Sequence, residues 1–429
     1  MEVERRGGVI RQGLGKHPQG RTQQPVRSYD ISKGLVYAAW QQVKASNGAA
    51  GADGVGIGAF ESNLDNELYK LWNRMSSGSY RAPAVKRVDI AKSDGKTRPL
   101  GIPTVGDRVA QTVVKMTLEA EWDYRFHPSS FGYRPARSAH QAVEAAKRNC
   151  WKYEWAIDLD IKGFFDNLSH EHLMAFVARG TRNPWCKLYI SRWIKAGVVM
   201  PDGETRTSEK GTPQGGVISP LLANLYLHMV FDGWMQKYFP RNPFERYADD
   251  VIIHCRSRKE AETVLKSVDQ RMQHFGLTLH PMKTRIVRCS RFKKPGTDPE
   301  SFDFLGFTFR RRTARRGDGK LFPGFSPAVS NKAKQSIVKS MSEWSVERLT
   351  LLTIIGLSKR LNPQVRGWFN YYGKFYPSAM KGIGKVIDFH LGKWVRWKFP
   401  KRCAHHGRAT EWLSPFRKSS AYLFAHWVC

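Results

Sequence analysis

The aspartates of two distant segments are the residues best suited to chemistry. Asp158 and Asp160 alternate with apolar residues over 155–161, which predicts a strand with one apolar face and one acidic face. Asp249 and Asp250 are adjacent and precede an apolar run, which predicts a hairpin with both acids at its turn. Carboxylates are preferred ligands of Mg²⁺, and two such ions can activate an attacking hydroxyl and stabilise a departing pyrophosphate. Brought together in one sheet, the two segments would form a cage for two magnesium ions.

Each segment taken alone also has a structural explanation. Aspartate pairs are common in turns because their side chains bond the nearby backbone, and Asp160 alone could be one half of a salt bridge. We assign structural roles to Asp158, as an acid behind the site, and to Asp166, as a turn former. The two segments together favour the metal cage, because neighbouring buried carboxylates repel each other unless a cation lies close by.

A basic hairpin is a second candidate for a functional site. Residues 90–103 predict a hairpin with Ser-Asp-Gly at its turn, and Lys92 and Arg98 stand on either side of that turn. Such a pair could clamp a triphosphate, with Arg as a bidentate fork and Lys as a point charge. A solvated basic hairpin is the alternative.

A glycine-rich segment, 211–216, precedes a predicted helix. Ser219 as N-cap and Pro220 at the first helical position mark the start of this helix. Its expected buried stripe consists of Leu221, Leu222, Leu225 and Met229. The glycines before it would let the backbone approach a bound nucleotide closely.

Other periodic segments outline the rest of the fold. Helices are predicted over 35–43, ending near Asn47, and over 60–75. Residues 302–309 alternate as one strand, and the arginines of 310–316 predict an exposed loop. From about residue 328 the pattern is helical, with Lys, Arg, Trp and Tyr interspersed, and most of these rings are expected to pack rather than stack on bases.

Three motifs occur in a fixed order along the chain. Tyr247-Ala248-Asp249-Asp250 matches the Y-x-D-D motif of reverse transcriptases. Residues 158–168 look like the first catalytic motif of group II intron reverse transcriptase/maturases, and residues 211–227 are similar to their middle motif. The chain is identified as a member of that family from about residue 29 to about residue 398. The resemblance implies an α+β, right-hand polymerase fold with fingers, a palm with an antiparallel sheet, and a helical thumb or maturase domain.

The resemblance also assigns roles to individual residues. The ligands of two Mg²⁺ ions would be Asp160, Asp249, Asp250 and the main-chain carbonyl of Ile161. The nucleotide would contact Lys92, Arg98, Phe165, Gln214, Gly215, Tyr247 and Ala248. Phe165 would be a steric gate against a ribose 2′-hydroxyl, with an ordinary core phenylalanine, as we assign Phe164, as the alternative. Lys283 could protonate the departing pyrophosphate or contact a phosphate.

The charge of the chain points to a polyanionic partner. Lys and Arg number 70 against 37 Asp and Glu, a formal net charge of +33. Residues 283–429 contribute 30 basic and 8 acidic residues, a net +22. This composition favours nucleic acid over the competing explanation, an anionic membrane surface. The residues expected to contact nucleic acid are Gly306, in a segment that resembles the primer grip, and Arg366, Lys374, Lys393 and Arg396.

We expect five consecutive regions. They are a flexible basic arm (1–27), an N-terminal extension (28–85), reverse transcriptase fingers and palm (86–312), a thumb/maturase domain (313–395) and a short basic DNA-binding tail (396–429). Many relatives end in an HNH nuclease module. The tail carries Cys403, His405, His406 and Cys429, but their spacing supports neither that module nor a zinc site.

Several classes of protein are disfavoured. No run approaches the roughly 20 apolar residues of a membrane helix, and the first residues do not resemble a secretory signal. The six cysteines form no C-x-x-C pair, which disfavours a disulfide scaffold. We therefore expect an intracellular, cytoplasmic location in a bacterium or organelle, near the nucleoid when the protein acts on DNA.

The expected function is RNA-dependent DNA synthesis together with maturase activity. The expected partners are group II intron RNA, a target DNA that supplies the primer, and deoxynucleoside triphosphates, with no membrane. The sequence leaves open whether the protein is a monomer or a dimer. Two alternatives remain: an RNA-binding splicing cofactor with a vestigial polymerase site, and a domesticated group II-like enzyme of repair or defence.

Overall fold

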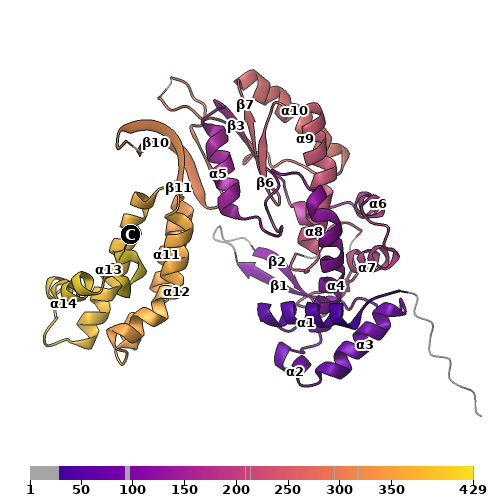
Figure 1. Cartoon of the computed structure of the whole chain (residues 1–429), viewed down its shortest axis with the longest axis horizontal. Helices are drawn as coiled ribbons and strands as arrows, with labels where there is room; N and C mark the ends of the chain where they lie inside the picture. Colours follow the sequence, from indigo (N-terminus) through magenta and orange to yellow (C-terminus); the bar gives the residue numbers. More distant parts are fainter. Residues whose placement is uncertain are drawn as a thin grey trace, which may run out of the picture.

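The chain forms a larger α/β body and a smaller helical body joined by a curved two-stranded ribbon (Figure 1). The computed structural model describes residues 29–91, 97–207, 209–212, 214–293, 295–315 and 318–428. The predicted basic arm, Lys92 and the turn of the basic hairpin lie outside these residues. Among the described helices, none combines the length and the apolar character that crossing a membrane requires.

Three helices form the N-terminal extension. The predicted helix over 35–43 is confirmed as part of α1 (Lys33–Ser46), which ends at a left-handed Asn47. The single helix predicted over 60–75 is wrong: α2 (Ile57–Glu61) and α3 (Leu64–Ser76) are separate. The break lies at Asn63, whose φ of −128° leaves the helical region.

The fingers contain a four-stranded sheet in the order β2-β1-β4-β5. Its strands are β1 (Val85–Ala91), β2 (Thr97–Ile102), β4 (Val198–Val199) and β5 (Thr205–Arg206). β1 and β2 pair antiparallel from Lys86–Ile102 to Ala91–Thr97, so the predicted hairpin is confirmed up to its turn. The helices that pack around the fingers and the adjoining palm are α4 (Val105–Trp122), α6 (His170–Gly180) and α7 (Pro184–Ile194).

The palm is built on a second sheet, in the order β6-β7-β3-β8. Its strands are β3 (Trp155–Asp160), β6 (Phe244–Tyr247), β7 (Asp250–Cys255) and β8 (Arg285–Arg288). Ile157 and Leu159 are buried in the main core together with residues of α10 (Arg258–His274), whereas Ala156 on the opposite face packs with α5 (Ala139–Cys150) (Figure 1). The predicted division of β3 into an apolar and an acidic face is therefore confirmed.

The helix after the glycine-rich segment begins close to its predicted start. α8 (Ser219–Leu227) has Ile218 as its N-cap, so Ser219 lies in the first turn instead of capping it. The predicted stripe holds for Leu221, Leu222 and Leu225, which are buried. The helix continues through a π-helical turn (His228–Asp232) into α9 (Gly233–Tyr238).

A three-stranded sheet, in the order β11-β10-β9, connects palm and thumb. The single strand predicted over 302–309 is wrong, because Leu305 and Gly306, with φ of 52° and 80°, form a two-residue turn between β9 (Ser301–Phe304) and β10 (Phe307–Arg315). The loop predicted for 310–316 is also corrected. Residues 310–315 belong to β10 and pair with β11 (Leu321–Val329), although Arg310 and Arg311 remain exposed.

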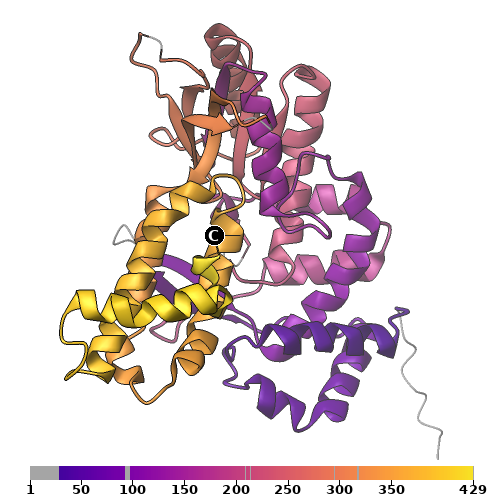
Figure 2. The same cartoon turned by 60° about the vertical axis from the view of Figure 1, so that its left-hand side comes forward.

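The thumb is a helical body with a core of its own (Figure 2). It contains α11 (Asn331–Ser342), α12 (Ile354–Tyr372), α13 (Lys381–Lys398) and α14 (His406–Ser419). Apolar residues recur at helical spacing on its long helices, for example Leu357, Leu361 and Val365 on α12, and face this core. Cys403, Leu413 and Trp427 are buried in the same core, so residues 396–428 pack against the thumb.

Short 3₁₀ turns complete the chain. They are Asp123–Arg125, Phe164–Asp166, Val346–Leu349, Pro377–Met380, Ala421–Leu423 and Ala425–Trp427. The turn at Phe164–Asp166 begins four residues after the last residue of β3, Asp160.

Candidate active site

The register of the palm sheet brings the two acidic segments together. β3 and β7 pair antiparallel, and Asp160 lies directly opposite Asp250. Tyr247 pairs with Asp250 across the β6–β7 hairpin, so Ala248 and Asp249 form its two-residue turn. One cavity of about 500 Å³ is lined by charged side chains of Asp158, Asp160, Asp249, Asp250, Lys283, Arg285 and Asp303. The predicted hairpin is confirmed with Asp249 in its turn, whereas Asp250 is the first residue of β7, and all three predicted metal-binding aspartates share this cavity.

The buried Arg246 supports the hairpin from behind. Its guanidinium donates two hydrogen bonds to Asp232, of 2.7 and 2.6 Å, and both side chains are fully buried. It also donates to the Ala248 carbonyl (3.0 Å) and to Asn224 (2.9 Å). Although burial alone would raise it, the neighbouring guanidinium holds the pKa of Asp232 below its ordinary value. This ion pair thus fixes the turn that carries Asp249.

The turn at Ala248 and Asp249 packs closely against the backbone of a neighbouring segment. Ala248 has a φ of 57°, in the left-handed region. Gly132 lies against it, and a Cβ at this glycine would come within 2.5 Å of the Ala248 nitrogen. Asn224 holds the Gly132 carbonyl through a 2.7 Å hydrogen bond. A glycine is therefore required at position 132 for the hairpin to keep its place.

Burial raises the pKa of three aspartates of the cavity, Asp158, Asp249 and Asp250. Burial, reinforced by Asp158 and Asp249, raises the pKa of Asp250 well above its ordinary value. Burial also raises the pKa of Asp249, with a further contribution from Asp160, while Arg98 opposes the shift. The pKa of Asp158 rises to about 6, again through burial, despite the hydrogen bond from Arg285. A bound cation would relieve this repulsion.

Two cations on the β8 side partly neutralise the acids. The Lys283 ammonium lies 3.2 Å from Asp160, and the Arg285 guanidinium lies 3.0 Å from Asp158. Lys283 therefore stands within the cavity, as its predicted role at the site requires, and its contact here is Asp160.

The carbonyl of Ile161 points away from its bridge partner. Ile161 faces Leu279 in an isolated antiparallel bridge. The flanking groups carry this bridge: the Lys162 N–H donates to Thr278 and the His280 N–H donates to the Asp160 carbonyl. Because successive carbonyls of a strand point to opposite sides, the Ile161 carbonyl is directed toward the β7 side, where the acids lie.

The β9–β10 turn closes the cavity from the thumb side. The Leu305 N–H donates a hydrogen bond to Asp250, which lowers the pKa of that acid against the effect of burial. Tyr371 donates to the Leu305 carbonyl (3.0 Å), and a Cβ at Gly306 would meet the Tyr372 hydroxyl at 3.1 Å. The predicted primer-grip glycine thus lies between the acids and α12, and its close neighbour in this structure is a thumb tyrosine.

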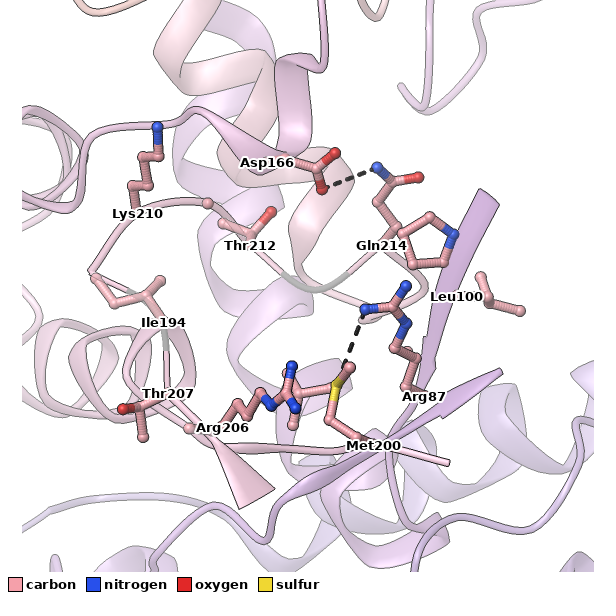
Figure 3. A pocket seen from close by; sticks show the side chains of 15 residues that line it. Arg87, Leu100, Asp166, Ile194, Met200, Arg206, Thr207, Lys210, Thr212 and Gln214 are labelled. Atoms are coloured by element: carbon pink, nitrogen blue, oxygen red, sulfur yellow. Dashed lines mark hydrogen bonds between the residues drawn. The ribbon is translucent and has the colours of Figure 1, made fainter. Parts of the chain in front are cut away.

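A relay of polar side chains links fingers and palm at Gln214. Arg98 donates to Gln214 (2.7 Å), and Gln214 donates to Asp166 (3.2 Å), as the close-up shows for the second bond (Figure 3). Gly101 donates to the Gln214 carbonyl, and a Cβ at Gly215 would lie 2.3 Å from the Gly101 carbonyl. The close approach that we predicted for the glycines is therefore, at Gly215, an approach to the backbone of the fingers hairpin.

These residues border a second, mainly apolar cavity of about 320 Å³ (Figure 3). Leu100, Ile194 and Met200 line its apolar part, and Arg87 and Arg206 reach in from β1 and β5. Arg87 donates a 3.8 Å hydrogen bond to the Met200 sulfur. The cavity separates Gln214 from the outer strands of the fingers.

The adjacent phenylalanines differ as predicted. Phe164 is buried, which confirms its core role, whereas Phe165 is half-buried and packs edge-on against Phe164 at 5.3 Å. Tyr247 is half-buried, and the centre of its ring lies 6.1 Å from that of the Tyr133 ring. The gate role of Phe165 stays a prediction.

The thumb residues predicted to contact nucleic acid differ in their exposure and in their ion pairs. Arg366 and Lys374 are exposed. Lys393 is paired with Glu347 at 3.1 Å, and Arg396 is half-buried, its Nε without a hydrogen-bond partner among the described residues. Most of the thumb aromatics pack: Trp394 is buried, and Trp344 stacks on Trp368 at 5.9 Å, but Trp397 is 61% exposed.

Sequence reasoning missed Arg246, Asp232 and Gly132, which hold the β6–β7 hairpin in place. Arg246 directly precedes the Y-x-D-D motif, but its strand, Phe244–Tyr247, also contains Glu245, so the local pattern does not mark this arginine as buried. No local signal identifies its distant partner Asp232. The Leu305 N–H, as a backbone group, could only be found from the fold.

An acidic palm hairpin, a fingers hairpin and a helical thumb define a right-hand, template-directed nucleic acid polymerase. Residues 90–309 match the family described as reverse transcriptase (RNA-dependent DNA polymerase), and residues 334–412 match the group II intron, maturase-specific domain. The chain belongs to the reverse transcriptase family and, with this second domain, to its group II intron branch.

Individual relatives agree with this placement. Protein YkfC of Escherichia coli is 31% identical over 305 residues, which cover 62% of this chain and 77% of YkfC. The group II intron-encoded protein LtrA of Lactococcus lactis is 34% identical over 248 residues, 57% of this chain but only 40% of LtrA. A nuclear intron maturase of Arabidopsis thaliana mitochondria is 29% identical over 111 residues, 24% of this chain and 15% of the relative.

Proposed function

We propose that the protein binds its group II intron RNA, assists the splicing of that RNA as a maturase, and copies it into DNA from a primer supplied by the DNA target. The observation that carries this proposal is the pairing of Asp160 with Asp250 beside the Asp249 turn, in a reverse transcriptase chain that also has a maturase domain.

The donor set suits magnesium. Asp160, Asp249, Asp250 and the Ile161 carbonyl offer only oxygen atoms, and their mutual repulsion favours a cation between them. Two bound Mg²⁺ ions would activate the primer 3′-hydroxyl and stabilise the departing pyrophosphate. Within the described residues, no group of three His, Cys, Asp or Glu side chains is arranged to hold a metal ion. Mg²⁺ sites of this kind usually combine one or two carboxylates with substrate phosphates, and we propose that combination here.

Fingers and palm residues orient the nucleotide. Arg98, tied to Gln214, would release this contact to take a phosphate, and Lys92 is proposed to assist it from the same hairpin. Phe165 would exclude a ribose 2′-hydroxyl, while Gly215, Tyr247 and Ala248 would shape the floor beneath the sugar and base. Lys283 would give its proton to the pyrophosphate as it leaves.

The thumb would hold the RNA. Residues 331–428 contain 18 Lys and Arg against 4 Asp and Glu, and cations on helices can follow a phosphate backbone without reading sequence. Arg366, Lys374, Lys393 and Arg396 are the proposed contacts, together with Gly306 at the primer. The proposal also includes the five regions predicted from the sequence. It places the site of action inside the cell, near the nucleoid when DNA is the target.

Primer extension tests the polymerase proposal. The full chain should extend a DNA primer on an RNA template with deoxynucleotides and Mg²⁺. Asp160→Asn should reduce the rate by about 10³-fold, because a lost charged ligand costs several kcal/mol of transition-state stabilisation. Asp65→Asn, which removes an exposed acid of α3, is the matched control and should be as active as the unmodified chain. Equal activity of all three proteins would overturn the assignment.

A splicing assay separates the maturase role from its alternatives. The unmodified chain should accelerate splicing of an intron RNA transcribed from the DNA that flanks its gene. A vestigial polymerase site would leave this activity without primer extension, and a domesticated enzyme would extend primers without promoting splicing. The shared cavity of Asp160, Asp249 and Asp250 favours the full, two-activity protein.

A further inference from the structure

The catalytic cavity holds its own cations. In the described part of the chain, its charged lining consists of five aspartates and two cations, Lys283 and Arg285. The acids therefore outnumber the positive charges, and the arrangement has a place for further cations. How the two resident cations are attached determines what a metal ion would have to displace.

The two cations form two parallel ion pairs with two of the five aspartates. Lys283 Nζ lies 3.2 Å from Asp160 Oδ2, and Arg285 Nη2 lies 3.0 Å from Asp158 Oδ2. The acids are two residues apart on β3 and share one face, and the cations are two residues apart on the neighbouring segment. Each cation thus matches one acid.

The two ion pairs differ in how firmly they are held. Arg285 is part of β8, in register with Asp158, whose side chain is only 14% exposed. Lys283 stands on an exposed turn, and its side chain is 61% exposed. A long, flexible lysine side chain can leave its acid without any movement of the backbone.

The backbone of this turn is nevertheless fixed beside Asp160. The His280 N–H donates to the Asp160 carbonyl at 2.8 Å, and the Asp160 N–H donates to the Thr284 hydroxyl at 3.3 Å. The turn is therefore anchored at both ends to the residue whose carboxylate Lys283 contacts. Lys283 remains within reach of Asp160 and of any ligand that Asp160 binds.

We propose that Lys283 is the resident counterion of Asp160, which a divalent cation must displace in order to bind, whereas Arg285 stays on Asp158 throughout. The proposal rests on the metal site of the proposed function. Displacement would free the lysine at the moment when a metal ion and its phosphate ligands arrive. Lys283 would then hold the cavity together without metal and set the divalent concentration at which the site fills.

Binding of Mn²⁺, measured by electron paramagnetic resonance on the full chain without nucleic acid or nucleotide, tests this competition. Lys283→Met should bind Mn²⁺ at the acidic cavity roughly two- to fivefold more tightly, a modest factor because the ion pair is exposed. Lys283→Arg should restore the affinity of the unmodified chain. Lys266→Met, which removes an exposed lysine of α10, is the control for net charge and should leave the affinity unchanged.

A second readout is thermal stability. Without divalent ions, Lys283→Met should melt at a lower temperature than the unmodified chain, because Asp160 loses its counterion. Added Mn²⁺ should raise its melting temperature by more than it raises that of the unmodified chain. Weaker or unchanged Mn²⁺ binding by Lys283→Met would overturn the inference.

Asp160→Asn separates failure of this inference from failure of the proposed function. If Asp160→Asn weakens Mn²⁺ binding while Lys283→Met leaves it unchanged, the metal site stands and the competition is wrong. If Asp160→Asn does not affect Mn²⁺ binding, the metal site itself is wrong and the competition falls with it.

Discussion

The palm and the thumb place their charges in opposite ways. In the palm, a few half-buried aspartates are fixed by strand register, as Asp160 is opposite Asp250, and a buried ion pair supports their turn. In the thumb, cations such as Arg366 and Lys374 are exposed on the surface of a separate hydrophobic core. A site for chemistry needs defined geometry, whereas binding along a phosphate backbone needs summed charge. We therefore expect single substitutions to have large effects in the palm and small effects in the thumb.

The largest effect should come from removing a palm acid. Asp249→Ala should slow DNA synthesis by about 10³-fold or more, because it removes the proposed metal ligand at the hairpin turn. Intron splicing and RNA binding should persist, because the thumb core does not depend on the palm hairpin. Primer extension and splicing assays on the same preparation measure both. A parallel loss of both activities would remove the distinction between the two regions.

Breaking the ion pair beneath the palm hairpin should be the next largest change. Arg246→Met leaves Asp232 buried without its guanidinium partner and should lower the free energy of unfolding by about 3–5 kcal/mol. Denaturant unfolding measures it. The double variant, Arg246→Met with Asp232→Leu, should recover part of the lost stability, because both members of the buried ion pair are then replaced by apolar side chains. Arg258→Met, at an exposed ion pair, is the control and should change little.

Sugar selection should respond more moderately. Phe165→Val should raise incorporation of ribonucleotides relative to deoxynucleotides by at least about tenfold, because the ring that would meet the 2′-hydroxyl is removed. Single-nucleotide primer extension gives the ratio. Phe164→Val is the matched control: it should lower the melting temperature through a core cavity and leave sugar choice unchanged. Unaltered selectivity in Phe165→Val would refute the gate.

Single thumb cations should give the smallest effects. Arg366→Ala and Lys374→Ala should each weaken binding to intron RNA about two- to fivefold, and should each reduce the slope of log affinity against log salt by about 0.7–0.9. Filter binding over a salt series measures both quantities. A loss of several hundredfold from one substitution would indicate a specific pocket in place of distributed phosphate contact.

Local pattern was sufficient to predict the acidic strand and the Y-x-D-D hairpin. Both are short, their periodicity is that of strands, and their acids lie where an apolar run begins or ends. The fingers hairpin could be predicted for the same reason. The motif order then identified a polymerase, since it indicates which distant strands must meet.

The structural predictions failed where the pattern of one segment changes partway along it, or where a residue's partner is distant in the sequence. The phenylalanines at 302, 304, 307 and 309 change phase at Leu305-Gly306, which marks a two-residue turn that we interpreted as continuous strand. The arginines of β10 predicted a loop because their charge concealed a strand held by backbone bonds to β11. The pairing of Arg246 with Asp232 depends on tertiary packing that no local pattern contains.

The most direct test of the central claim is to locate divalent ions in the palm. We would measure anomalous diffraction from crystals of the full chain with Mn²⁺, an RNA template, a DNA primer and a non-reactive deoxynucleotide analogue. The account predicts two peaks between the carboxylates of Asp160 and Asp249, roughly 3.5–4 Å apart. Ordered nucleotide with no peak in contact with either carboxylate would contradict it.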